Sequence, residues 1–119
     1  MIDQYLNRMY RPRTYNCAHF VCDVWRDLKG EEMALLLKGF LCGRSQRKAD
    51  FYLLKKHVTF LDKPETPSVV LMQRPRMPAH VGIWINRKVL QITLSGVTYY
   101  PLDIATMGYR KVRFFTCNM

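Results

Sequence analysis

A cysteine at the start of a predicted helix and a histidine at the start of a predicted strand are the residues of this chain best suited to chemistry. Cys17 follows Asn16, a favoured N-cap residue, and the apolar residues after it recur at helical steps until Gly30. A thiol in the first turn lies at the positive end of the helix dipole, near unpaired backbone N–H groups, which favours thiolate and can supply an oxyanion site. Cysteine is also among the residue types most often buried, so this placement alone also fits packing beneath the helix.

The histidine belongs to a segment, residues 80–85, that alternates as strands do. A two-residue hairpin loop at positions 86–87 would place Gln91 opposite Gly82 and make it a diagonal neighbour of His80 on the same face. Such positions lie about 7 to 8 Å apart, within reach of a glutamine amide that orients an imidazole. A three-residue loop would turn Gln91 to the other face.

A Cys–His pair with a third polar group is the arrangement that nucleophilic acyl transfer requires. In that arrangement Cys17 is the nucleophile, His80 the base and then the acid, and Gln91 the residue that orients the ring. A strand histidine or glutamine by itself is commonly structural, so the combination carries the hypothesis. Tyr15, the backbone at Ala18 and the side chain of His19 are further candidates for contacts with substrate or with the oxyanion.

The four cysteines, at positions 17, 22, 42 and 117, show no CxxC or Cys/His zinc spacing. The chain is also long enough to build a core without disulfides. We therefore expect reduced thiols, no metal and no cofactor.

The elements that must position these residues change in type along the chain. Helices are predicted at residues 1–9, 17–29 and 31–41, the last ended by Gly43, and residues 44–50 form a loop or begin another short helix. Strands are predicted at residues 58–61, 68–72, 80–85, 89–93, 97–100 and 111–115. Helices followed by strands indicate a single α+β domain over residues 1–119, with N-terminal helices on one face of a C-terminal antiparallel sheet.

Composition limits the partners. The 119 residues carry a formal charge of +10, with +5 on each side of Phe60, which favours a polyanionic partner but provides no separate basic arm. No nucleic-acid-binding motif accompanies the charge, so a nucleic acid is not the expected partner. The longest apolar runs are far shorter than the roughly 20 residues that span a bilayer, and polar residues interrupt positions 1–10 where a secretory signal would need an apolar segment. We expect no membrane insertion.

Two segments resemble the NlpC/P60 family of papain-like cysteine peptidases. Residues 16–21 read Asn-Cys-Ala-His-Phe-Val, and residues 80–85 read His-Val-Gly-Ile-Trp-Ile, like the family's nucleophile helix and its histidine strand. The resemblance continues through residues 89–91, where the family has its third polar residue, and through 96–102. It covers most of the chain from Tyr15 onward.

This resemblance implies a papain-like fold and cleavage of amide bonds in bacterial peptidoglycan stem peptides. Small stand-alone members resemble hydrolases that phage tails carry, which implies wall cleavage as a phage penetrates the cell, with other tail-tip proteins as partners. The protein would then be a virion tail component. Alternatively, it would be made in the bacterial cytoplasm and delivered to the periplasm or wall by another assembly, as an antibacterial amidase effector.

Three departures from the family pattern keep an alternative open. Asn-Cys-Ala-His replaces the common Asp-Cys-Ser-Gly, Gln91 replaces the more frequent histidine, and residues 66–68 replace the usual Pro-Gly-Asp. A neutral glutamine stabilises imidazolium less than a carboxylate does. A structural tail or baseplate protein of the same fold with reduced activity is therefore the competing interpretation.

Overall fold

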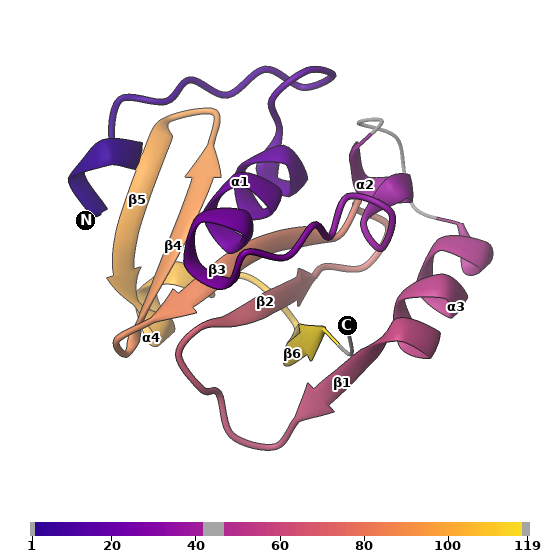
Figure 1. Ribbon diagram of the computed structural model, residues 1–119. Coiled ribbons are helices and arrows are strands. Elements are labelled where there is room, and N and C mark those ends of the chain that lie inside the picture. Colours follow the sequence, from indigo (N-terminus) through magenta and orange to yellow (C-terminus); the bar gives the residue numbers. More distant parts are fainter. Residues whose placement is uncertain (1, 42–46, 118–119) are drawn as a thin grey trace.

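The computed structural model describes residues 2–41 and 47–117, in which helices precede strands (Figure 1). The helical elements are η1 (Ile2–Tyr5, a 3-10 helix), α1 (Cys17–Lys29), α2 (Lys38–Leu41), α3 (Lys48–His57) and α4 (Leu102–Ala105). The strands are β1 (Val58–Leu61), β2 (Ser68–Gln73), β3 (His80–Ile85), β4 (Lys88–Thr93), β5 (Gly96–Pro101) and β6 (Lys111–Cys117). The predicted α+β class and all six predicted strands are confirmed.

The strands form one antiparallel sheet in the order β1-β6-β2-β3-β4-β5. Because side chains alternate along a strand, the sheet buries two separate sets of residues. On one face Val69, Leu71 and Ile83 pack in the main core with α1, while on the other Val70 and Met72 pack in a smaller cluster. This double burial gives β2 its nearly continuous apolar sequence.

Helix α1 confirms the prediction made for it and lies across β3 and β4. Asn16 is the N-cap, and Gly30 ends the helix in the left-handed conformation at φ 69°, which glycine adopts without steric cost. The buried face includes Phe20, Val24 and Trp25, each fully enclosed. This helix therefore fixes Cys17 against the strand that begins with His80.

The predicted helix at residues 31–41 is wrong over most of its length, because only Lys38–Leu41 is helical. Side-chain hydrogen bonds compete with the helix here: Glu31 accepts one from Trp25 Nε1 in α1 at 3.1 Å, and Glu32 accepts one from the backbone N–H of Ala34, two residues on, at 3.2 Å. Both carboxylates are thus used outside a helical first turn. The predicted end at Gly43 lies outside the described residues.

The opening helix predicted for residues 1–9 is limited to the 3-10 turn Ile2–Tyr5. The segment predicted at residues 44–50 as a loop or a helix start falls partly outside the described residues, and α3 begins within it at Lys48. This helix continues to His57 through positions that had no predicted element.

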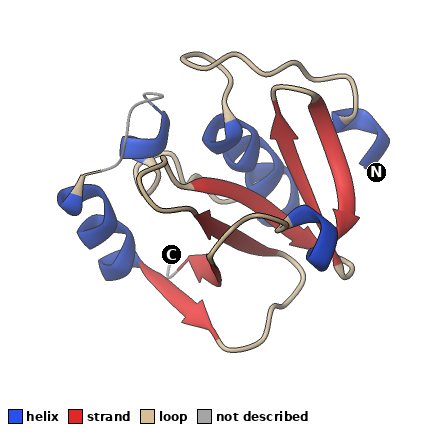
Figure 2. Cartoon of the chain, turned by 180° about the vertical axis from the view of Figure 1, so that it is seen from behind, coloured by secondary structure: helices blue, strands red, loops and turns tan. Residues whose placement is uncertain are grey.

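The opposite face of the sheet is covered by a short C-terminal helix that had no predicted counterpart. Helix α4 packs Ala105 against Val70, Met72 and Val89 on the face opposite α1. Figure 2, which views the molecule from behind, shows α4 in front of the sheet and α1 beyond it. Both faces therefore exclude water from the middle of β2 and β3.

Cys17, Cys22 and Cys117 are free in the structure, and Cys42 lies outside the described residues. None of the helices within residues 2–41 and 47–117 combines the length and apolar content needed to cross a bilayer.

Candidate functional site

Asn16 holds the start of α1 by hydrogen bonds in two directions. Its Oδ1 accepts the backbone N–H groups of Ala18 at 2.9 Å and His19 at 3.4 Å. Its Nδ2 donates to the carbonyl oxygens of Pro12, Phe40 and Leu41 at 3.0 to 3.2 Å. One buried amide therefore ties the helix start to the preceding loop and to α2, and so fixes the backbone that carries Cys17.

Replacement of Asn16 by Ala is expected to lower the free energy of unfolding by about 2 to 4 kcal/mol. The change removes an N-cap and leaves three backbone carbonyls without their donor at a position only 3% exposed. Urea denaturation followed by circular dichroism measures the loss. Asn16→Asp is the matched variant: it keeps the capping oxygen but not the amide donor, so we expect it also to destabilise. A stability equal to wild type in both variants would contradict this role.

Cys17 lies in the first turn of α1 and is partly exposed. Burial raises the pKa of its thiol above the ordinary value, and hydrogen bonds with the backbone of Val81, Ala18 and Cys17 itself act in the opposite direction. The helix start therefore does supply the predicted backbone donors, but desolvation exceeds their effect. The resting group is a thiol, in contrast to the thiolate that the position in the helix favours.

Alkylation of Cys17 by iodoacetamide is therefore expected to follow a pH midpoint above 9.0, the ordinary value for a cysteine thiol. Only the deprotonated sulfur attacks the reagent, and the raised pKa postpones deprotonation to higher pH. Cys17 and Cys22 share the tryptic peptide of residues 14–26, so fragment ions from tandem mass spectrometry assign the alkylated residue, and glutathione in the same solution supplies the reference curve. Rapid alkylation of Cys17 at pH 6 would instead indicate a stabilised thiolate.

The predicted hairpin register is confirmed. Asn86 and Arg87 form the two-residue loop, both with positive φ (49° and 72°), and Ile85 pairs with Lys88. Gln91 consequently lies on the same face as His80, and its Oε1 is 2.6 Å from the Nε2 atom of the imidazole.

Gly82 provides the room for this contact, because a Cβ atom there would lie 3.3 Å from the Cβ of Gln91 and 3.0 Å from Val89 Cγ1. Since an amide oxygen only accepts, Nε2 carries the hydrogen, and Nδ1 is the unprotonated nitrogen of the neutral ring.

The ring of His80 is also held from the side. Tyr109 stacks on it with centroids 6.0 Å apart and an interplanar angle of 14°, and the guanidinium of Arg74 lies 4.3 Å from the Tyr109 centroid. Burial lowers the pKa of His80, the hydrogen bond that its Nε2 donates to Gln91 raises it, and the charge of Arg74 lowers it. The imidazole is thus positioned on two sides and stays neutral at physiological pH.

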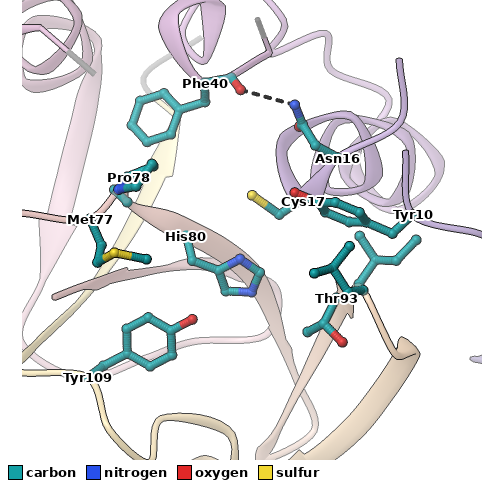
Figure 3. A pocket seen from close by; sticks show the side chains of 12 residues that line it. Tyr10, Asn16, Cys17, Phe40, Met77, Pro78, His80, Thr93 and Tyr109 are labelled. Carbon is teal, nitrogen blue, oxygen red and sulfur yellow. Dashed lines mark hydrogen bonds between the residues drawn. The ribbon is translucent and has the colours of Figure 1, made fainter. Parts of the chain in front are cut away.

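The thiol and the imidazole open into the same cavity of about 340 Å³. Figure 3 shows the sulfur of Cys17 and the ring of His80 facing into this pocket from α1 and β3. The remaining lining is largely apolar and comprises Tyr10, Asn16, Phe40, Met77, Pro78, Ala79, Ile92, Thr93, Leu94 and Tyr109. We call this the thiol pocket. Its geometry joins a nucleophile, a neutral base and a group that orients the base.

Three further candidates lie outside the lining of the thiol pocket. Tyr15 uses its hydroxyl in a bond to Asp23 Oδ2 at 2.7 Å and accepts one from Arg8. Ala18 is fully buried, and the Nδ1 atom of His19 accepts the backbone N–H of Asn16 at 3.1 Å. The structure therefore brings Cys17, His80 and Gln91 together. Tyr15, Ala18 and His19 instead pack or form hydrogen bonds within and beside α1.

Two tyrosines of the thiol pocket had no predicted role. The hydroxyls of Tyr10 and Tyr109 point into the pocket (Figure 3), and burial raises the pKa of each. Both side chains therefore stay protonated and can donate a hydrogen bond there. Tyr10 lies seven residues before Cys17, so its closeness to the nucleophile in the sequence could have indicated a place in the pocket. Tyr109 reaches the pocket only through the pairing of β6 with β2.

No group of three or more His, Cys, Asp or Glu side chains within residues 2–41 and 47–117 has the arrangement of a metal site. Comparison with family models, curated proteins and solved structures gives no match to this chain. The geometry of the thiol pocket and the sequence resemblance are therefore the two indications of function.

Proposed function

We propose that the chain is a cysteine hydrolase of the papain-like NlpC/P60 type, which cleaves amide bonds in peptidoglycan stem peptides. One observation carries the proposal: the 2.6 Å contact between His80 Nε2 and Gln91 Oε1 leaves Nδ1 as the ring nitrogen able to accept a proton, in the cavity that also contains Cys17. The reaction type follows from this set of residues. The substrate follows from the sequence resemblance, and the charge of +10 suits an anionic wall polymer.

The first half of the reaction forms an acyl-enzyme. His80 Nδ1 takes the proton of the Cys17 thiol as the sulfur attacks the carbonyl carbon of the substrate. The carbonyl oxygen becomes an oxyanion beside the backbone N–H at the start of α1, with the hydroxyl of Tyr10 as a second donor. The imidazolium then gives its proton to the leaving amine as the carbon–nitrogen bond breaks.

The second half restores the enzyme. His80 takes a proton from water, whose oxygen attacks the thioester carbonyl, and the carbon–sulfur bond breaks as the proton returns to the sulfur. Gln91 stays bound to Nε2 and keeps Nδ1 directed toward the pocket in both halves. Because the thiol and the imidazole rest uncharged, the base acts on a thiol and not within a preformed ion pair.

Replacement of Gln91 by Leu is expected to lower kcat by about 10- to 100-fold with little change in KM. Leucine removes the acceptor of the Nε2–H group, so the ring loses its fixed tautomer and orientation. Gln91→His, which restores a polar partner, is expected to recover most of the activity. Steady-state kinetics on a purified stem peptide measures both, and equal activity of wild type and Gln91→Leu would exclude the orienting role.

Mass spectrometry of muropeptides incubated with the protein tests the proposed function. We expect new fragments that differ from the substrate by the addition of one water across a stem-peptide amide bond. The result also identifies the bond cleaved. If muropeptides from walls of several stem-peptide types stayed intact after long incubation with folded protein, the result would contradict the proposal.

A structural tail or baseplate protein with the same fold is the second candidate. The raised pKa of the Cys17 thiol and the neutral partner of His80 favour it, because both reduce the population of a reactive thiolate. Such a protein would copurify with virions and produce no fragments from any wall preparation.

A further inference from the structure

A second cavity, of about 190 Å³, lies beside α3 on the face of the sheet that α1 covers farther along. Figure 1 shows α3 standing next to the β1 and β6 edge of the sheet. The cavity is lined by Phe51, Leu54, Lys55, Phe60, Leu71, Gln73, Lys111 and Arg113. It shares no lining residue with the thiol pocket.

Three cationic side chains surround this cavity, and no carboxylate lines it: Lys55 from α3, and Lys111 and Arg113 from β6. Among the residues that the structure describes, none of the three forms an ion pair. Residues 1, 42–46 and 118–119 contain no Asp or Glu, so the undescribed part of the chain adds no acidic side chain. Like charges held together in this way repel one another unless an anion joins them. We call these three residues and their cavity the basic groove.

Arg113 is prearranged within the basic groove. Its guanidinium lies 3.5 Å from the centroid of the Phe60 ring, a close cation–π contact that holds the planar donor group. In the β2–β6 register, Gln73 pairs with Lys111 and Leu71 with Arg113. Gln73 and Lys111 are therefore cross-strand neighbours that both line the cavity, and Leu71 supplies an apolar wall. Apolar surroundings strengthen charge-assisted hydrogen bonds to an anion.

We propose that the basic groove is a binding site for a phosphate group. A phosphate offers several oxygens to the guanidinium fork and the two ammonium groups, whereas a single carboxylate occupies only the fork. A phosphate also carries more charge than a carboxylate and therefore neutralises more of the groove. The phosphate belongs either to a small molecule or to the phosphodiester chain of an anionic polymer. Phosphate binding in the basic groove does not depend on the chemistry of Cys17.

Titration with inorganic phosphate, followed by phosphorus NMR at constant ionic strength, tests the site. We expect saturable binding that weakens about 10-fold in Arg113→Gln and several-fold in Lys111→Gln, because each removes a direct partner of the anion. Arg113→Lys keeps the charge and loses the fork, so its affinity should fall between wild type and Arg113→Gln. Lys88→Gln removes an equal charge three strands away and should change affinity less than about 2-fold.

A poly(glycerol phosphate) chain, used as a second probe, distinguishes the two sources. Tighter binding of the chain than of inorganic phosphate indicates a polymer, and binding of inorganic phosphate alone indicates a small ligand. Equal weakening by Lys88→Gln and Arg113→Gln would overturn the site, since it would reflect only net charge. Equal affinity for acetate and phosphate would overturn the assignment to phosphate. Cys17→Ala should bind phosphate as wild type does, whatever its activity on muropeptides.

Discussion

Replacement of Cys17 by Ala is expected to abolish amide hydrolysis, with a loss of at least about 10³-fold in kcat/KM. The change removes the atom that forms the acyl-enzyme, while Asn16 still caps α1 and the cavity keeps its other walls. Because the side chain is small and partly exposed, the free energy of unfolding should change by no more than about 1 kcal/mol. Muropeptide kinetics and urea denaturation on the same sample separate the two effects.

Cys117→Ala is the matched control for Cys17→Ala. It removes a free thiol at the end of β6, outside the lining of the thiol pocket, and should retain wild-type kcat/KM. Cys17→Ser should be as inactive as Cys17→Ala, because the alcohol is a weaker nucleophile than the thiol with the same base. Undiminished cleavage by Cys17→Ala would remove the nucleophile and end the proposed function, but it would leave the basic groove unaffected.

The parts of this site that sequence predicts are those that local rules control. Asn16 and Gly30 delimit α1 because a side-chain cap and a left-handed C-terminal residue are local requirements. A two-residue loop sets the strand register, and the register in turn sets which face Gln91 occupies. The contact between His80 and Gln91 therefore follows from the sequence once the loop length is correct.

Tertiary contacts control the parts that sequence does not predict. Trp25 binds Glu31 from the neighbouring helix, and the segment after it turns where its apolar spacing favours a helix. Tyr109 stacks on His80 because β6 lies between β1 and β2 in the sheet. No short sequence motif predicts this strand order.

Burial of the Cys17 thiol likewise depends on the surrounding walls of the pocket. Helix position alone predicts the direction of the backbone effect on its pKa, but not the larger effect of desolvation.

Replacement of His80 by Asn is expected to lower kcat/KM by about 10²- to 10⁴-fold, the usual contribution of a general acid–base group. Because the resting pair is uncharged, His80 does not stabilise a thiolate, so the pH midpoint for alkylation of Cys17 should stay nearly the same in this variant. In the wild type, kcat/KM should fall as pH drops through a midpoint below 6.5, since burial lowers the pKa of His80 and only the neutral ring accepts a proton.

His57→Asn is the matched control, because it removes an exposed imidazole at the end of α3, away from the thiol pocket. Its kcat/KM, and the midpoint of the fall in kcat/KM at low pH, should equal those of the wild type. A shift of the alkylation midpoint to higher pH in His80→Asn would show that the imidazolium stabilises a thiolate in the wild type. The enzyme would then work through a preformed ion pair. In that case the fall in kcat/KM at low pH would reflect protonation of the Cys17 thiolate instead of the His80 ring. Alkylation and hydrolysis measured on one set of variants thus identify which of the two groups holds the proton before substrate binds.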